Sequence, residues 1–304
     1  MRGLGIQDGK TEIEMQINKG GMEGRLFDDL VIAIVFYNGD NIVNKNIKTL
    51  SKACSSILII NNKSDDESQK VITEAEKNES VMIINNDENM GIGYALNQAL
   101  EYAVSIKKKF LLTMDQDSII SVECVYKLLK CLDSGDEQLA SVGPYYLSKC
   151  DTDSTVKYLI TSGNMISVEV AKRIGGFDSS LFIDCVDLDF SFKLLAHGYR
   201  MSLVGGAYME HKIGDIQKDS PIGIPYLGHG AERNYYNFRN NVYIYRKYIR
   251  ILPGRCIKLF LSLCLKILKI LFVEGNKKDK FAQSWRGIKS GFDMDISLIR
   301  GTGK

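Results

Sequence analysis

Apolar runs and polar breaks alternate regularly along the first half of this chain. Four of the apolar runs are continuous and rich in β-branched residues, at 30–37, 55–62, 80–86 and 108–117. Such runs are typical of strands covered on both faces of a sheet. Segments of helical length lie between or after them, at 41–53, 65–77, 92–105 and 121–133. This alternation predicts βαβ units and therefore a mostly parallel, Rossmann-like α/β sheet flanked by helices.

The second half of the chain is less repetitive. Its pattern predicts strands at 140–147 and 156–168, helices at 168–177 and 187–200, a kinked strand at 201–211 and mostly helix from residue 230 onward. We therefore expect three parts, which are a loose leader at 1–28, an α/β domain at 29–250 and an amphipathic helical C-terminal extension at 251–304.

Composition narrows the class of protein. The 304 residues are 45% hydrophobic and 25% charged, as in an ordinary globular protein with a core. A net charge of +2 gives no reason to expect a nucleic-acid partner. The seven cysteines are scattered and never spaced CxxC, which favours reduced thiols in a cytoplasmic setting. The N-terminal stretch has no apolar segment typical of a secretory signal.

Polar loops follow all four predicted strands of the first half. They begin at Tyr37-Asn38, at Asn61-Asn62, at the stretch NNDENMGIG and at Asp115-Gln116-Asp117. Right-handed crossovers place the carboxyl ends of parallel strands along one edge of the sheet. Ligands of open α/β sheets bind along that edge. Four converging polar loops therefore indicate a polar, charged ligand.

Asp115 and Asp117 end the fourth apolar run one residue apart. Ionised carboxylates at the end of a buried strand need a positive partner. A divalent cation would supply it, and oxygen ligands beside a phosphate-bearing ligand suit Mg²⁺ or Mn²⁺. The alternative is a solvated loop in which Asp117 or Ser118 caps the helix that begins near residue 121.

In their order along the chain, these motifs resemble glycosyltransferase family 2. The resemblance covers about residues 30–250 and includes VIAIVFYN, ILIINNKS, NNDENMGIGYALNQAL, LLTMDQDS, SGNMIS and FIDCVDLDF. The segments DQDS and FIDCVDLDF are similar to those of bacterial rhamnosyltransferases that build polysaccharide antigens. The resemblance implies a GT-A fold, a nucleotide-sugar donor, a divalent cation and an inverting reaction.

The resemblance also implies roles for particular residues. The donor would be bound by Tyr37, Asn38, Asn61, Asn89, Gly91, Gly93, Asn97, Asp115 and Arg239. Asn61 stands where many members carry an aspartate, and its amide can still pair with a base. Asp117 and His211 would hold the metal. Each of these positions also has a structural explanation, because loop turns and a surface arginine would account for the same residue types. As a fingerprint of dinucleotide binding, the Gly91–Gly93 stretch is weak.

Three acids, Asp184, Asp187 and Asp189, cluster at the start of the helix predicted at 187–200. Inversion needs one base on the face opposite the leaving group, within hydrogen-bond reach of the acceptor hydroxyl. Asp187 matches the family's base position, and Asp184 is the second candidate. Asp189 is explained as charge that complements the helix dipole.

The segment at 255–273 is long and apolar enough to suggest a membrane span. However, Lys258, Ser262, Lys266 and Lys269 share one helical face, and lysines near the bilayer centre cost about 2.5–3.5 kcal/mol each. This pattern favours a helix that lies on an anionic membrane surface. The alternative is a helix packed on the protein's own core or on a second copy in a homodimer.

The function that these observations favour is transfer of a sugar, L-rhamnose from dTDP-rhamnose or a sugar from a UDP-sugar, to a polysaccharide or lipid-linked glycan in cell-surface biosynthesis. The protein would work in the cytoplasm, peripherally on the inner face of the plasma membrane. One alternative is a sugar nucleotidyltransferase, but the loop YNGDNIVNKN lacks the Gly-rich basic run that such enzymes use for a triphosphate. The other is a non-catalytic module that binds glycans or protein partners.

Overall fold

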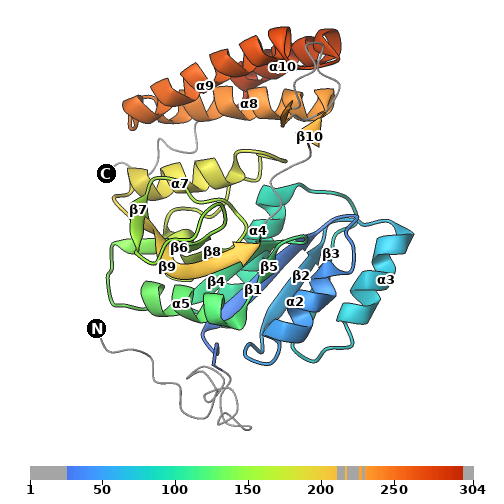
Figure 1. Cartoon of the computed structure of the whole chain (residues 1–304), viewed down its shortest axis with the longest axis vertical. Helices are drawn as coiled ribbons and strands as arrows, with labels where there is room; N and C mark the ends of the chain where they lie inside the picture. The colour runs from blue at the N-terminus through green and yellow to red at the C-terminus, as the bar shows by residue number, and fades with distance from the viewer. Residues whose placement is uncertain (1–25, 211–215, 218–225, 228–229, 297–304) are drawn as a thin grey trace.

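A computed structural model describes residues 26–210, 216–217, 226–227 and 230–296. The four apolar runs of the first half form four neighbouring parallel strands in the order β3-β2-β1-β4. Their bounds are β1 (Leu30–Phe36), β2 (Ile57–Asn61), β3 (Val81–Asn85) and β4 (Phe110–Asp115). The prediction of parallel βαβ units is thus confirmed, and all four strands end at the same edge (Figure 1).

Helices cover both faces of this sheet. The connecting helices are α2 (Ile42–Leu50), α3 (Asp66–Ala75), α4 (Ile92–Ser105) and α5 (Val122–Leu132). One core contains the apolar sides of α2, α3 and α5, and a second contains those of α4, α7 and α8. Phe27 is fully buried in the first core, so the folded domain begins within the segment expected to be a leader.

The second half extends the sheet with strands of mixed direction. Strand β8 runs antiparallel to β4, and β6 joins β8 to β9. The bounds in this half are β5 (Ile119–Ile120), β6 (Leu139–Tyr145), β7 (Ser154–Val156), β8 (Asn164–Ser167), α6 (Val168–Arg173), α7 (Val186–Ala196) and β9 (Arg200–Glu210). The antiparallel pairing brings the segment before β8 alongside the end of β4, because Gly163 donates its backbone N–H to Thr113.

The C-terminal helices form a separate layer beside α7 (Figure 1). They are α8 (Ala231–Tyr248), α9 (Pro253–Phe272) and α10 (Lys277–Asp293), preceded by the two short strands β10 (Ile216–Gln217) and β11 (Tyr226–Leu227). Helix α10 lies close against α8, since a Cβ at Gly287 would come within 2.3 Å of the carbonyl oxygen of Tyr235. The boundary expected at residue 250 therefore cuts through one helical layer.

A buried ionic cluster joins this layer to the sheet domain. Lys247 of α8 donates to Asp178 at 2.7 Å and to Asp189 at 2.8 Å, and its side chain is 3% exposed. Burial alone would raise the pKa of Asp178, but the charge of Lys247 holds it well below its usual range. Asp189, explained from the sequence as a dipole charge, is fully buried here. Breaking one partner of such a cluster leaves an uncompensated charge, so α8 is fixed firmly against α7.

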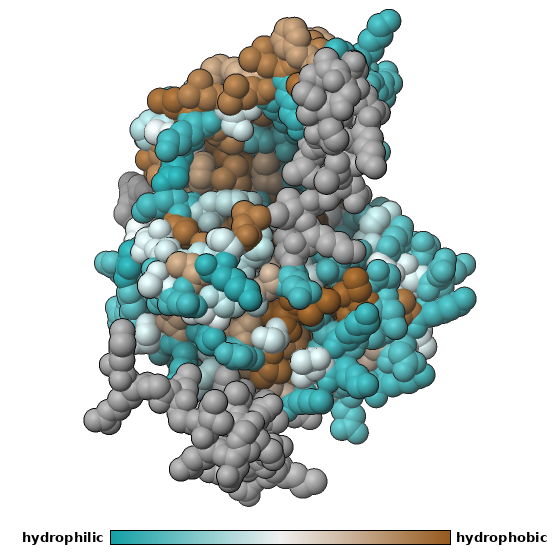
Figure 2. Space-filling view, viewed as in Figure 1, coloured by the Kyte–Doolittle hydropathy of each residue, from teal (hydrophilic) through white to brown (hydrophobic). Residues whose placement is uncertain are grey.

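Helix α9 has its polar and apolar faces in an unusual orientation. Ser262 and Lys266 line a cavity between α9 and the rest of the molecule, whereas most of the apolar side chains face outward. Figure 2 shows this apolar surface along the α9–α10 end of the molecule. Among the described residues, no helix combines the length and the apolar character that crossing a bilayer requires.

Candidate functional site

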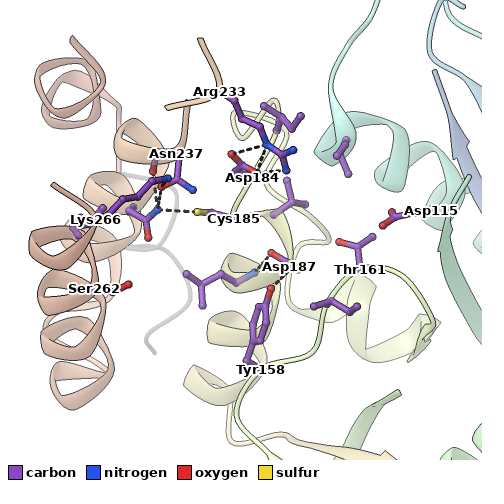
Figure 3. A pocket seen from close by; sticks show the side chains of 17 residues that line it. Asp115, Tyr158, Thr161, Asp184, Cys185, Asp187, Arg233, Asn237, Ser262 and Lys266 are labelled. Carbon is purple, nitrogen blue, oxygen red and sulfur yellow. Dashed lines mark hydrogen bonds and ion pairs between the residues drawn. The ribbon is translucent and has the colours of Figure 1, made fainter. Parts of the chain in front are cut away.

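A cavity of about 550 Å³ lies where the sheet domain meets the helical layer. It is lined by side chains from the end of β4, the start of α7, the loop before it, and helices α8 and α9. Its polar residues include Asp115, Tyr158, Asp184, Asp187, Arg233 and Lys266 (Figure 3). Two carboxylates predicted from separate motifs, Asp115 and Asp187, therefore share one cavity.

The two acids of the β4 loop open toward different spaces. Asp115 lines the main cavity, while the exposed Asp117 lines a neighbouring hollow with Asn38 and Gln116. Burial raises the pKa of Asp115 to about 6, and the nearby charges of Asp117 and Asp187 add to the shift. Ionised Asp115 is therefore disfavoured, first by desolvation and then by neighbouring negative charge, and a bound cation would offset this cost.

The loop that carries Asp184 has an unusual backbone. Asp184 and Cys185 have φ angles of +63° and +65°, a left-handed conformation that non-glycine residues rarely adopt. Asn240 of α8 holds this turn by donating to the carbonyl oxygens of Ile183 and Asp184, at 2.7 and 2.9 Å. Strained turns persist when the surrounding structure fixes them, and they are concentrated at functional sites.

Arg233 stands at this turn and pairs with Asp184. Its Nη2 and Nε atoms lie 2.9 and 3.1 Å from Oδ1 of the carboxylate. The Arg233 side chain is 46% exposed and Asp184 is 12% exposed, so the cation is accessible to a ligand that enters the cavity. In this structure Asp184 is thus engaged with a cation and is less available as a base than Asp187.

Asp187 lies in the first turn of α7 and has one hydroxyl partner. Tyr158 donates its phenolic hydrogen to Asp187 Oδ2 at 2.5 Å, while Asp187 Oδ1 accepts the backbone N–H of Leu188. Burial raises the pKa of Asp187, although these two hydrogen bonds oppose the change. A carboxylate with a raised pKa is a stronger base when ionised, as proton abstraction from a hydroxyl requires.

Tyr37 and Asn38 follow β1 at the same edge of the sheet. Gln116 clamps Tyr37 in place, because its amide accepts from Tyr37 N at 2.8 Å and donates to Tyr37 O at 3.1 Å. The Tyr37 ring is left 45% exposed. Asn38 lines the neighbouring hollow of about 500 Å³, which also contains Asp117. The β1 and β4 loops therefore converge as predicted.

Asn61 and Asn89 belong to a network of asparagines between loops. The amide of Asn61 donates to Gln69 and Asn85, and its oxygen accepts the backbone N–H of Ser64. The oxygen of Asn89 accepts from Asn62 and from the backbone of Gly91. Both predicted donor-binding side chains thus have partners within the protein, and the base contact proposed for Asn61 stays a prediction.

Gly91, Gly93 and Asn97 contact another part of the chain. A Cβ at Gly91 would come within 2.5 Å of Phe182 O, and one at Gly93 within 2.4 Å of Asp178 O. The side chain of Asn97 donates to Phe177 O and accepts from Phe177 N. These residues therefore seat the 177–182 loop, which leads into the Asp184 turn, against the start of α4.

Arg239 does not line the main cavity. Its guanidinium donates to Ser180 O at 2.9 Å and lies over the Tyr236 ring at 5.0 Å. Arg233, six residues earlier on the same helix, occupies the position facing the acids. His211, the other predicted metal ligand, lies outside the described residues.

The acids of the β4 loop suit a divalent cation that the ligand helps to hold. They do not suit a cation that is held by protein side chains alone. Within the described part of the chain, no three His, Cys, Asp or Glu side chains form a group that could hold a metal ion. Mg²⁺ and Mn²⁺ sites of phosphate-binding enzymes commonly use one or two carboxylates and take their other oxygens from the ligand. The β4 loop offers two carboxylates of this kind, the partly buried Asp115, whose pKa is raised by desolvation and by neighbouring acids, and the exposed Asp117.

The sequence reasoning assigned no role in the cavity to three of the residues that line it. Tyr158, Arg233 and Lys266 come from a loop, from α8 and from α9, and only tertiary packing brings them together. For Lys266 there is a partial signal, since lysine on an otherwise apolar helix must face something polar. For Tyr158 and Arg233 the local sequence offers none.

Comparison with known proteins agrees with this geometry. The sequence model of glycosyl transferase family 2 matches residues 31–183. The chain is 27% identical over 245 residues to the dTDP-rhamnosyl transferase RfbF of Shigella flexneri, covering 72% of this chain and 80% of that protein.

Solved structures show the same fold. The mannosyltransferase PcManGT of Pyrobaculum calidifontis, in complex with GDP-Man and Mn²⁺, has a TM-score of 0.55 at 14% identity, covering 95% of this chain and 81% of that one. GalNAc-T7, solved with UDP, GalNAc and Mn²⁺, has a TM-score of 0.56 at 16% identity over 76% of this chain and 48% of its own. The GT-A architecture predicted from the sequence is confirmed.

Proposed function

Because this chain belongs to glycosyl transferase family 2, we propose that it is an inverting enzyme that transfers L-rhamnose from dTDP-rhamnose to a polysaccharide or lipid-linked glycan. The 27% identity to a dTDP-rhamnosyl transferase supports this choice of donor. The observation that carries the proposal is the shared cavity. It contains Asp115, at the end of a strand where the donor would lie, and Asp187, with a raised pKa, where the acceptor would be activated.

The acceptor hydroxyl is the nucleophile in this proposal, and Asp187 is its base. As the hydroxyl oxygen bonds to the anomeric carbon, its proton moves to Asp187 and the bond from that carbon to the diphosphate oxygen breaks. The hydroxyl of Tyr158 remains hydrogen-bonded to Asp187 Oδ2 and so orients the carboxylate. Asp184, already paired with Arg233, would contact a sugar hydroxyl and has the positioning role.

The leaving diphosphate needs positive charge beside it. Asp115 and Asp117 would hold Mg²⁺ or Mn²⁺, which when bound supplies electrostatic stabilisation of the leaving group. Arg233 is an accessible cation of the cavity whose charge acts on Asp115, and it would exchange part of its contact with Asp184 for the phosphate oxygens. Tyr37 and Asn38 would contact the nucleoside in the neighbouring hollow.

An apolar surface on the helical layer would place the enzyme on a membrane. Its residues on α9 are all at least half exposed, and they are Ile257, Phe260, Leu261, Leu265, Leu268 and Phe272. Trp285 and Phe292 of α10 are exposed as well. Exposed apolar patches of this kind mark interaction surfaces. We call this set the α9–α10 apolar surface (Figure 2).

The charges near this surface favour anionic lipid over a second copy of the chain. Arg250, Arg286 and Lys289 are exposed on the same helical layer, and Lys289 lies 5.6 Å from the ring of Trp285. In a two-fold dimer the same patch meets itself, which would bring the cations around the patch of one copy toward the equally cationic patch of the other. An anionic bilayer instead attracts each of them. The protein would therefore act peripherally on the inner face of the plasma membrane, near a lipid-linked acceptor.

Nucleotide-sugar hydrolysis tests the catalytic assignment, since water can replace the acceptor. Wild type should hydrolyse dTDP-rhamnose to dTDP and free rhamnose with Mn²⁺, and faster than it releases the nucleoside diphosphate from a UDP-sugar or GDP-mannose. Asp187→Asn should lose at least about a hundredfold in rate and still show the thermal shift caused by dTDP and Mn²⁺. Asp133→Asn, a change at the exposed end of α5, serves as the control. Undiminished turnover in Asp187→Asn would show that another group is the base.

Flotation with phosphatidylglycerol vesicles tests the membrane assignment. Leu265→Glu combined with Phe272→Glu should abolish co-flotation, while Leu147→Glu, at an equally exposed apolar residue of the sheet domain, should leave it intact. Size-exclusion chromatography of the same proteins separates the homodimer alternative. A wild-type dimer that the double variant converts to a monomer, without vesicle binding by either, would assign the surface to a second copy.

A further inference from the structure

Lys266 is a partly buried cation without a carboxylate partner. Its Nζ donates to the neutral Asn237 Oδ1 at 2.8 Å, and within the described part of the chain no Asp or Glu oxygen pairs with it. The ammonium also lies 5.5 Å from the Phe238 ring. Burial lowers the pKa of Lys266, and the charges of Asp184 and Glu274 oppose this change only in part. An anionic group entering the cavity would oppose it further.

The position of Lys266 in the cavity separates it from the donor side. In the view of Figure 3, Asp115 lies at one side of the cavity, Lys266 and Ser262 lie at the opposite side, and Asp187 lies between them. A donor diphosphate held at the β4 loop would therefore occupy the side away from Lys266. The group that reaches Lys266 must then belong to the acceptor, on the other side of the base.

The wall around Lys266 is built from polar groups on two helices. Asn237 accepts from Lys266 and also, at 3.4 Å, from Asn241, whose amide donates to Cys185 Sγ at 3.3 Å. This chain of contacts links Lys266 to the turn that carries Asp184. Ser262, one turn earlier on α9, adds a hydroxyl that lines the same cavity. Amide, hydroxyl and ammonium donors together suit the oxygens of a phosphate group.

Opposite faces of helix α9 differ in chemical character. Lys266 faces the cavity, and the apolar side chains next to it, Leu265 and Leu268, face outward. A helix with its side chains is only about 10–12 Å across, so an anion at Lys266 would lie within that distance of the apolar surface. A ligand that joins a phosphate to a hydrocarbon chain matches both faces.

We propose that Lys266, with Asn237 and Ser262, forms an acceptor subsite that binds the phosphate linking the acceptor sugar to a hydrocarbon chain. This inference rests on the proposed sugar transfer, because the acceptor side is defined by the donor carboxylates and the base. The helical extension then supplies part of the substrate site in addition to membrane contact. Lys266 contacts the acceptor's linker and takes no part in the proton transfer.

A binding experiment with soluble probes tests the subsite. Titrations of the full-length protein use farnesyl diphosphate, farnesol and inorganic pyrophosphate, in EDTA so that metal-dependent binding at the donor loop is absent. Farnesyl diphosphate should bind wild type at least tenfold more tightly than either fragment. Lys266→Met should lose at least tenfold of this affinity, and Lys266→Arg should retain most of it. Lys258→Met, a change at an exposed lysine two turns earlier on α9, should bind like wild type.

The remaining outcomes each decide one question. Equal affinity of Lys266→Met and wild type, or an equal loss in Lys258→Met, overturns the subsite. Pyrophosphate binding as tight as farnesyl diphosphate overturns the assignment to a chain-linked phosphate. If Lys266→Met loses affinity for phosphatidylglycerol vesicles by the same factor as for farnesyl diphosphate, Lys266 binds the lipid surface in general, and the subsite is overturned. Binding of dTDP with Mn²⁺ should persist in Lys266→Met; its absence from wild type would refute the proposed function and not the subsite alone.

Discussion

Replacing Asp115 by Asn should stabilise the protein in the absence of ligands. Burial and the charges of Asp117 and Asp187 raise the pKa of Asp115 from an ordinary 3.8 to about 6. Each unit of pKa shift corresponds to about 1.4 kcal/mol, so ionised Asp115 destabilises the native state by up to about 3 kcal/mol. Asparagine removes the charge with little change in shape.

The sign of the pH dependence follows from the raised pKa. The native state binds the Asp115 proton more tightly than the unfolded chain does, so the cost of ionisation is absent below pH 4 and complete above pH 6. The stability difference between Asp115→Asn and wild type should therefore be near zero at pH 4. It should grow through the window from pH 4 to 6 and reach up to about 3 kcal/mol at pH 7.

Thermal unfolding at a series of pH values measures this difference. For a chain of this size about 1 kcal/mol shifts Tm by roughly 2 °C, so Asp115→Asn should melt roughly 5 °C above wild type at pH 7. Adding dTDP and Mn²⁺ should reverse the order. Ligand at a hundred times its Kd stabilises wild type by about 2.7 kcal/mol, whereas the variant without the carboxylate should gain little.

Asp117→Asn is the matched comparison on the same loop. It removes a neighbouring charge that raises the pKa of Asp115, so it should give a smaller stabilisation over the same pH window. A Tm for Asp115→Asn at or below that of wild type at pH 7 would refute the reasoning. It would mean that the Asp115 carboxylate is compensated by the protein itself and does not await a cation.

Three further predictions concern the base, the ionic cluster and the loop before the base. Tyr158→Phe removes a donor that lowers the pKa of Asp187, so the acidic limb of the kcat/KM profile should move to higher pH. Lys247→Met should lower the free energy of unfolding in urea by about 3–5 kcal/mol, since Asp178 and Asp189 lose the cation that they share and only Lys193, 3.5 Å from Asp189, remains paired with that carboxylate. Gly93→Ala, whose Cβ would lie 2.4 Å from a facing carbonyl oxygen, should cost about 1–3 kcal/mol in the same titration and reduce turnover.

Each of these has a control and an adverse result. An unchanged acidic limb in Tyr158→Phe would show that the ionisation of Asp187 does not set that limb of the kcat/KM profile. Lys172→Met, at an exposed lysine of α6, should leave the free energy of unfolding in urea unchanged. A loss of stability equal to that of Lys247→Met would contradict the explanation by a buried ionic cluster. A Cβ at Gly254 would meet open space, so Gly254→Ala should not lose stability through a close contact. A loss as large as that of Gly93→Ala would contradict the close-contact explanation.

Periodicity predicted the sheet because buried parallel strands need apolar side chains on both faces. Strands β1 to β4 and helices α2 to α5 lie within a few residues of the predicted segments. The convergence of polar loops at one edge followed from the handedness of βαβ connections, which is a general property of L-amino-acid chains. For the same reason Asp115 could be placed at a ligand-binding edge before the structure was known.

Partners that come from distant segments could not be predicted in this way. Asp189 matched the simple pattern of an acid in the first turn of a helix, yet its charge is paired with Lys247, 58 positions away. Gly91 and Gly93 matched a ligand-binding loop, and their close neighbours are backbone atoms of the 178–182 loop. In both cases the local sequence fits two environments equally well, and only packing selects one.

By itself, the sequence determined the α/β architecture, the edge where the acids gather and the amphipathic character of the segment at 255–273, since each depends on spacing along the chain. Tertiary structure decided that Arg233, not Arg239, lines the cavity with Asp184, and that α9 turns Lys266 toward the cavity and Leu265 and Leu268 outward. The physical reason is that periodicity fixes which side chains share a face of a helix. Which way that face points depends on the elements packed against it, and these lie far away in the sequence.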